Sequence, residues 1–233
     1  MSTYDSAWFP CPRCGAASEH GFVASFNADR LVHRVDEILT GAFERVRCGS
    51  CGVTFQLEHR MLYAHATAGL WVAMYPCGER IHADEIEPSV RAIFERRLVD
   101  VPAFPVPAIR GTVTRVVFGL HALAEAIRVH AAGVDASALE CLKLELLRDH
   151  ESMLVAAGAG ELCYEGEAAH VLRFGLYRLD GIRLGEMTAG RGRLDEIAAD
   201  HARWRDEYPD LFIGLYVSAL RYCDVLAPQP QYG

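Results

Sequence analysis

The spacing of hydrophobic and polar residues predicts short strands and helices in the first hundred residues. Four segments are predicted to be strands: Phe22–Phe26, Phe43–Arg47, Val53–Glu58 and Leu70–Tyr75. Apolar positions between residues 31 and 39 follow one face of a helix, which Asp29 is expected to cap and Gly41 to end. A second helix is expected from Glu87 and Pro88 onward. The pattern predicts a β-rich ribbon with one inserted helix, followed by a bridging helix.

The second half of the chain mixes longer helical segments with a hairpin. A strand is predicted at Val113–Phe118 with a helix directly after it, and Asp135 is expected to cap the next helix. Asp180-Gly181, between two apolar segments, is typical of a two-residue hairpin turn. A helix is predicted over residues 193–208, and residues 212–220 form either a helix or a strand. Helices against a small antiparallel sheet make this part α+β.

A proline-rich segment separates the two halves. Pro102, Pro105 and Pro107 lie within residues 101–110 and favour an extended connector. The predicted organisation is therefore a zinc-ribbon-like β domain with its bridging helix over residues 1–100, a linker, and an α+β domain over residues 111–233.

Two cysteine pairs carry the clearest chemistry in the sequence. They are Cys11-Pro12-Arg13-Cys14, followed by Gly15, and Cys48-Gly49-Ser50-Cys51, followed by Gly52. A two-residue gap lets both sulfurs of a tight turn face one ion, and the following glycine suits a turn with positive φ. The sequence therefore predicts a structural Zn²⁺ site with Cys11, Cys14, Cys48 and Cys51 as its ligands.

Other interpretations of the four cysteines stay open at this point. They could be two ordinary buried pairs, and thiolates also bind iron or an Fe–S cluster. Redox catalysis fits less well, because a thioredoxin-type pair lies at a helix start and works alone. Four sulfur ligands leave no position for water or substrate, so hydrolysis at the metal is not expected.

Composition narrows the classes of partner. The formal net charge is −8, and residues 1–75 hold six arginines against seven acidic residues, which argues against binding to nucleic acid or to an anionic membrane. Hydrophobic residues make up 51% of the chain, yet no apolar run is long enough to span a bilayer. The chain starts without the basic and apolar segments of a secretory signal, so we expect a cytoplasmic location. In a reducing cytosol, eight cysteines favour metal and buried thiols over disulfides.

The cysteine-bearing part resembles the CpXC family, a group of mostly bacterial proteins named for the Cys-Pro-x-Cys turn. The resemblance rests on CPRCG at Cys11–Gly15, on FNADRLVHRVDEILTGAFERVRCGSCG at Phe26–Gly52 and on LYAH at Leu62–His65. Residues Arg115–Ile127 and Val134–Leu147 also look like the companion region of longer members. The resemblance implies metal binding but no particular activity.

Two positions differ from the pattern of that family. Gly49 stands where a proline is usual, which leaves the four sulfurs in place and loosens the turn. Tyr63-Ala64-His65 stands where the family tends to have Tyr-His-Asp, so any role of that triplet is in question in this chain.

One further segment has the composition of an anion site. Gly190-Arg191-Gly192-Arg193 precedes a predicted helix, and exposed amides with two guanidinium groups could hold a phosphate. A solvated loop is the simpler interpretation of the same residues.

Three functions follow as hypotheses. The first is a non-catalytic zinc protein that presents a surface to a protein partner, with its oligomeric state left open by the sequence. The second is an enzyme with a site in residues 111–233 that no motif reveals. The third is nucleic-acid binding through the ribbon, which would need a basic groove in the folded protein.

Overall fold

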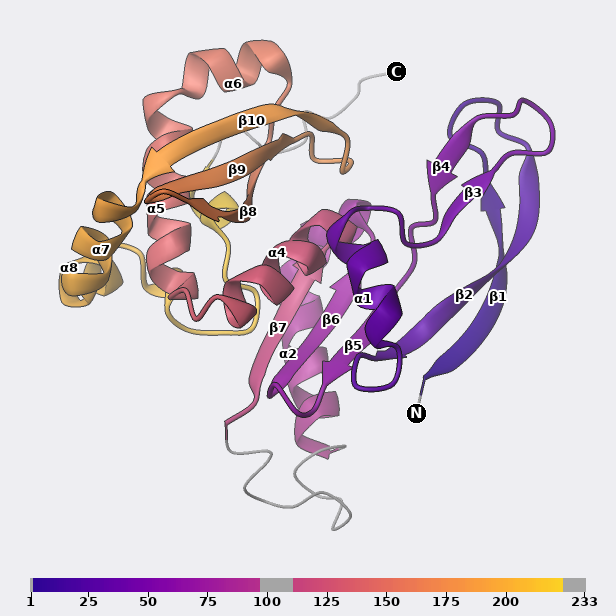
Figure 1. The fold of residues 1–233 in the computed structure, drawn as a ribbon, viewed down its shortest axis with the longest axis horizontal. Coiled ribbons are helices and arrows are strands. Elements are labelled where there is room, and N and C mark those ends of the chain that lie inside the picture. The colour runs from indigo at the N-terminus through magenta and orange to yellow at the C-terminus, as the bar shows by residue number, and fades with distance from the viewer. Residues whose placement is uncertain (1, 97–110, 224–233) are drawn as a thin grey trace. The chain divides into compact units, whose positions relative to one another are not determined.

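A computed structural model describes residues 2–96 and 111–223 (Figure 1). These residues form seven α-helices and three sheets of five, three and two strands. The α+β class predicted from the sequence is confirmed.

The chain forms two compact units, Met1–Ile127 and Arg128–Gly233. The predicted linker at residues 101–110 lies outside the described residues. The strand that follows it, β7 (Val113–Phe118), pairs in parallel with β6 (Leu70–Tyr75) of the first unit. The first unit therefore extends beyond the predicted boundary, because a strand from the second half of the chain completes its sheet.

The first unit is built on a mixed five-stranded sheet in the order β1-β2-β5-β6-β7. Its elements are β1 (Thr3–Pro10), β2 (Ala17–Asn27), α1 (Val32–Leu39), β3 (Arg45–Arg47), β4 (Thr54–Gln56), β5 (Met61–His65), β6, the 3₁₀ helix Cys77–His82, α2 (Ala83–Phe94), β7 and α4 (Leu120–Ala131). The β1–β2 and β5–β6 pairs are antiparallel, whereas β2–β5 and β6–β7 are parallel. The separate β3–β4 pair forms a short arm.

Helices cover both faces of this sheet where its strands are most apolar. Side chains of α1 and α4, such as Ile38 and Leu123, join Phe26 and Val72 in one buried cluster. On the opposite face, Trp71 of β6 contacts Phe94 of α2, with 5.5 Å between ring centroids. Strand β6 is buried on both faces, which explains its uninterrupted apolar sequence.

Asp29 does not cap α1. The residue before that helix is Leu31, and no side chain caps it. The Asp29 carboxylate instead accepts hydrogen bonds from the backbone N–H groups of Ala66 and Thr67 and from the Thr67 hydroxyl. Asp29 therefore ties the loop before α1 to the β5–β6 turn, a contact between segments distant in sequence.

Helix α2 also begins earlier than predicted. It starts at Ala83 and contains Pro88 in its interior. Proline removes one backbone hydrogen bond there, and the helix buries Ala83 and Val90.

The second unit packs helices against an antiparallel three-stranded sheet in the order β10-β9-β8. Its elements are α5 (Ala136–Asp149), α6 (Glu151–Ala157), β8 (Glu161–Ala168), β9 (Val171–Tyr177), β10 (Arg183–Gly190), α7 (Arg191–Ala199), α8 (His201–Glu207) and two 3₁₀ turns, Pro209–Leu211 and Ala219–Tyr222. Asp135 caps α5 as predicted, accepting from the Ala138 N–H at 2.9 Å. The predicted hairpin at Asp180-Gly181 joins β9 and β10, but its loop, residues 178–182, is longer than the predicted two-residue turn.

The C-terminal part of this unit differs from the prediction. The single helix expected over residues 193–208 is divided at Asp200, whose backbone leaves the helical region. Residues 212–220 form neither the long helix nor the strand considered from sequence, and Gly214 has a φ of +99° that would break either.

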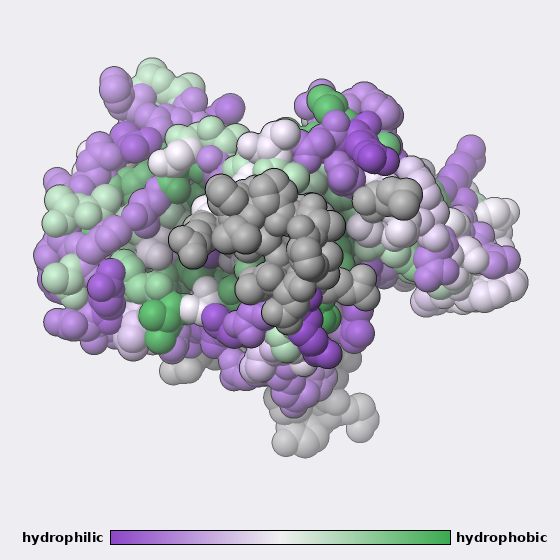
Figure 2. Space-filling model, turned by 90° about the horizontal axis from the view of Figure 1, so that it is seen from below, coloured by the Kyte–Doolittle hydropathy of each residue, from purple (hydrophilic) through white to green (hydrophobic). Residues whose placement is uncertain are grey.

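None of the described helices combines the length and the hydrophobicity needed to cross a bilayer. Hydrophilic residues are interspersed with hydrophobic ones on the face drawn in Figure 2.

The Asp29 contact predicts a pH-dependent stability. Burial opposes ionisation, but the hydrogen bonds from Thr67 and Ala66 outweigh it and lower the pKa of Asp29 below its ordinary value. A lowered pKa contributes stability that is present above the unfolded pKa of about 3.9 and is lost as the pH falls through the folded pKa. We expect Asp29→Asn to destabilise the protein by about 1–2 kcal/mol at pH 7.

Thermal unfolding of wild type and Asp29→Asn between pH 7 and pH 2 tests this expectation. The difference in Tm should shrink as the pH falls below about 4, because the wild-type carboxylate then takes up a proton and both proteins carry an uncharged side chain. Asp149→Asn, at the end of α5, is the control. A Tm difference that stays constant over this range would contradict the role of the carboxylate.

Candidate metal centre

The four predicted ligands lie in two turns with the same backbone pattern. In the first turn, the Cys11 N–H bonds the Ala16 carbonyl at 2.9 Å, and the Gly15 N–H bonds the Cys11 carbonyl at 2.9 Å. Gly15 has a φ of +71°, a conformation that glycine adopts without strain. This turn joins β1 to β2.

The second turn repeats that pattern between β3 and β4. The Cys48 N–H bonds the Val53 carbonyl at 2.8 Å, and the Gly52 N–H bonds the Cys48 carbonyl at 3.0 Å. Gly52 has a φ of +73°. The Arg47 guanidinium donates a hydrogen bond to the Gly52 carbonyl at 3.2 Å. This bond stabilises the second turn, which has Gly49 in its second position.

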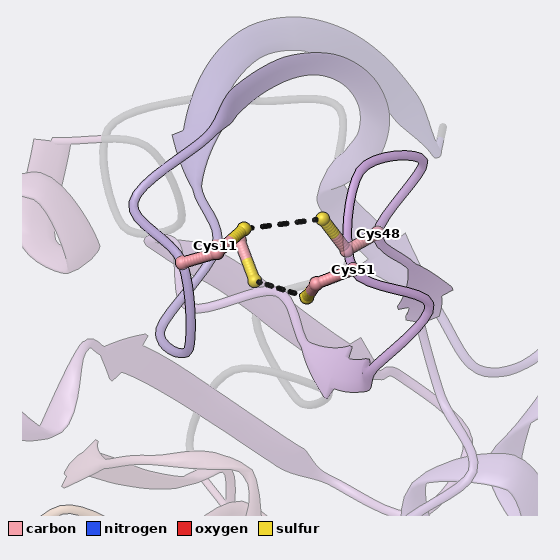
Figure 3. Close-up of side chains that lie close together, drawn as sticks. Cys11, Cys48 and Cys51 are labelled. Atoms are coloured by element: carbon pink, nitrogen blue, oxygen red, sulfur yellow. Dashed lines mark hydrogen bonds between the residues drawn. The ribbon is translucent and has the colours of Figure 1, made fainter.

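The two turns bring their sulfur atoms together (Figure 3). The Sγ atoms of Cys11 and Cys51 are 3.7 Å apart, as are those of Cys14 and Cys48. All four sulfurs lie within 4.8 Å of one another. A tetrahedron with metal–sulfur bonds of about 2.3 Å has edges of about 3.8 Å, so the observed arrangement fits one Zn²⁺-sized ion.

The sulfurs are thiols and not disulfides. All eight cysteines are free, and a separation of 3.7 Å is far beyond a bond length of about 2.05 Å. The four-cysteine cluster is therefore compatible with metal binding, and a tetrahedral site made of it would be closed to other ligands.

The apolar packing around this cluster is small. Its buried residues are Cys11, Cys48, Phe55 and Leu57, with partly buried neighbours such as Phe22. Cys14 is exposed and Cys51 half-buried, so the site lies at the surface of its unit. Because this cluster is small, a bound metal ion would add substantially to the stability of the two hairpin tips.

Backbone N–H groups near the sulfurs also act to lower the pKa values of two of the thiols. The N–H groups of Cys51 and Ser50 point at the Cys48 sulfur and lower its pKa to about 6. The Ala16 N–H acts in the same direction on Cys14, but the neighbouring thiols, Cys51 first, raise the pKa of Cys14 to about 12. Four adjacent sulfurs cannot all carry negative charge unless a cation neutralises them.

A buried Glu44–His59 contact, which the sequence analysis did not predict, lies at the base of the β3–β4 arm. Glu44, at a φ of +51°, places its Oε2 2.5 Å from Nε2 of His59, and both side chains are less than a tenth exposed. Its Oε1 accepts the Val23 backbone N–H at 2.6 Å. The His59 ring packs on Phe22, 4.5 Å between centroids. Glu44 thus links the arm to strand β2; a positive φ at a glutamate gives no signal in sequence.

Tyr63 and His65 of the Tyr63-Ala64-His65 triplet make contacts within the first unit. Tyr63 is fully buried and stacks on Phe26 at 5.5 Å between ring centroids. The His65 Nε2 lies 3.7 Å from the Asp29 carboxylate.

The arginines considered for anion binding are paired with carboxylates. Arg191 contacts Glu167 and Asp195, each at 2.8 Å. Arg193 pairs with Glu145 and, at 2.7 Å, with Glu196. Because acidic side chains already neutralise both guanidinium groups, the geometry does not support the anion site considered from sequence.

Comparison with known proteins gave one family. Residues 9–143 match the family model described as CpXC protein, which covers more than half of the 233 residues and includes both cysteine turns. No curated protein and no solved structure matches the chain.

The sulfur geometry predicts that one cysteine is indispensable. We expect Cys48→Ser to abolish stoichiometric metal binding and to unfold the two hairpin tips, because an ion in such sites contributes roughly 10–16 kcal/mol. Metal content by mass spectrometry and the Tm report the two effects. Ser50→Ala keeps the same turn and its amide and should behave like wild type. An unchanged Tm in metal-free wild type would contradict a structural site.

Metal binding should also depend on pH. Thiols must lose their protons to bind an ion, so binding releases protons and affinity falls as the pH is lowered. Titration of the apo protein with Zn²⁺ in a weakly buffered solution measures this release. A proton release that does not change between pH 6 and pH 8, together with constant affinity, would argue against thiolate ligands.

Proposed function

Because the chain belongs to the CpXC family, we propose that it is a non-catalytic protein-interaction module with a structural Zn²⁺ site. The ligands in this proposal are Cys11, Cys14, Cys48 and Cys51, and the facing turns form a zinc-ribbon-like tip. One observation carries the proposal: four sulfurs from two matching turns stand at tetrahedral spacing.

The closed ligand set supports a structural role over a catalytic one. Catalytic zinc keeps a coordination position for water or substrate, whereas four protein sulfurs fill the tetrahedron. The small apolar cluster beneath the turns also supports a metal, because it offers little other stabilisation. Zinc is proposed because four cysteine thiolates at tetrahedral spacing are the usual donor set of structural zinc sites.

The charge of the chain supports a protein partner over nucleic acid. With a net charge of −8, the protein lacks the overall positive charge that drives association with phosphate backbones. A reducing, cytoplasmic location is part of the proposal, because all eight cysteines have free thiols.

Affinity purification beside a metal assay tests the proposed function. We expect the tagged wild-type chain to retain about one zinc per chain and to co-purify with a defined protein partner or with untagged copies of itself. Cys48→Ser should lose both the metal and the captured protein, and Ser50→Ala should lose neither. Full capture by metal-free Cys48→Ser would separate interaction from the metal and contradict the proposal.

A further inference from the structure

Strand β1 forms one edge of the five-stranded sheet and leads directly into the first cysteine turn (Figure 1). It pairs with β2 on one side only. Among the described residues, no other strand pairs with its outer side. Exposed strand edges of this kind are templates for a further strand.

The hydrogen bonds of the ribbon show which backbone groups face that outer side. The Val23 N–H bonds Glu44 and not β1, so Val23 and its partner Tyr4 form a non-hydrogen-bonded pair. The Cys11 N–H bonds Ala16, which fixes the same alternation at the other end of the strand. The N–H and C=O groups of Tyr4, Ser6 and Trp8 therefore point outward.

Two large aromatic side chains accompany this edge. Tyr4 is 65% exposed and Trp8 is 69% exposed. They are four positions apart on a strand and therefore share one face, with Ser6 between them. Exposed aromatics next to an unpaired edge are typical of an interaction surface.

We propose that β1 pairs antiparallel with β1 of a second copy of this chain about a two-fold axis at Ser6. In this register Ser6 faces its own copy, and Tyr4 faces Trp8 of the other chain twice. The outward backbone groups of all three residues meet their counterparts as hydrogen-bonded pairs. The two aromatic pairs lie at cross-strand distance, with Cβ atoms about 5 Å apart.

The charges and the end of the strand agree with this register. Asp5 is the only charged residue of β1, and it faces Ala7 of the other copy, so no like charges oppose each other. Pro10, without an N–H group, ends the outward row next to the cysteine turn. The Ser6 N–H, now bonded to its neighbour Asp5 at 2.8 Å, would exchange that local contact for the facing strand.

The inference rests on the proposed interaction module and names its partner. The proposed metal site lies in the turn that joins β1 to β2, directly after the edge strand. Metal content and self-association are nevertheless separate measurements, and either can fail alone.

Sedimentation equilibrium of the full-length, zinc-loaded chain over a range of concentrations tests the pairing. We expect a mass that rises toward twice 25.7 kDa. Ser6→Pro removes an outward N–H without touching the β1–β2 hydrogen bonds, and it should weaken association by at least about tenfold. Ser6→Ala keeps the N–H and should associate like wild type.

A charge pair tests the register itself. Trp8→Glu and Tyr4→Arg should each weaken the dimer, by roughly tenfold. The double variant Tyr4→Arg/Trp8→Glu should recover part of the affinity, because opposite charges then face each other across the axis and not within one chain. Recovery in the double variant supports this register, and additive losses overturn it.

A wild type that stays at the mass of one chain while holding its zinc would overturn the pairing and leave the proposed metal site intact. The pairing would equally be overturned if a monomeric Ser6→Pro variant lost a different protein that the wild type binds, because β1 would then bind that protein and not a second copy. A wild type that holds no zinc would instead contradict the proposed function.

Discussion

Four adjacent cysteine sulfurs cannot all ionise without a cation, and this constraint governs the two cysteine turns of the first unit. The two turns place the sulfurs 3.7 Å apart without a bond, and little apolar surface supports them. Backbone amides stabilise one thiolate at Cys48, but they cannot compensate a second and a third. The divalent cation proposed above would resolve this conflict, and its binding would couple the fold of the tips to the occupancy of the site.

The Glu44 carboxylate connects the cysteine-bearing β3–β4 arm to the main sheet. Glu44 bonds His59 at the base of the arm and the Val23 amide in β2, so one carboxylate connects both hairpins to the sheet. Because the pair is buried, removing either partner would leave an unpaired polar group. The β3–β4 arm is therefore fixed to strand β2 of the sheet through the Glu44 carboxylate.

The locally encoded features of the fold could be predicted from sequence. The cysteine turns, the apolar strands β6 and β7, the Asp135 cap and the Asp180-Gly181 hairpin each depend on neighbouring residues. Strands β1, β5 and β8 were missed, because their polar and apolar residues fit a sheet only once distant partners are known. The four clustered cysteines could be predicted from their spacing, whereas Glu44 and Asp29 act through contacts that spacing does not encode.

The parallel pairing of β7 with β6 has a consequence for how the polypeptide is made. The sheet that carries the cysteine turns lacks its last strand until residue 118 has left the ribosome. Until then the apolar edge of β6 is open to other nascent chains, and an excised fragment ending near residue 100 would keep that edge permanently. Anyone expressing the cysteine-rich half by itself should therefore cut the gene after α4, not at the prolines.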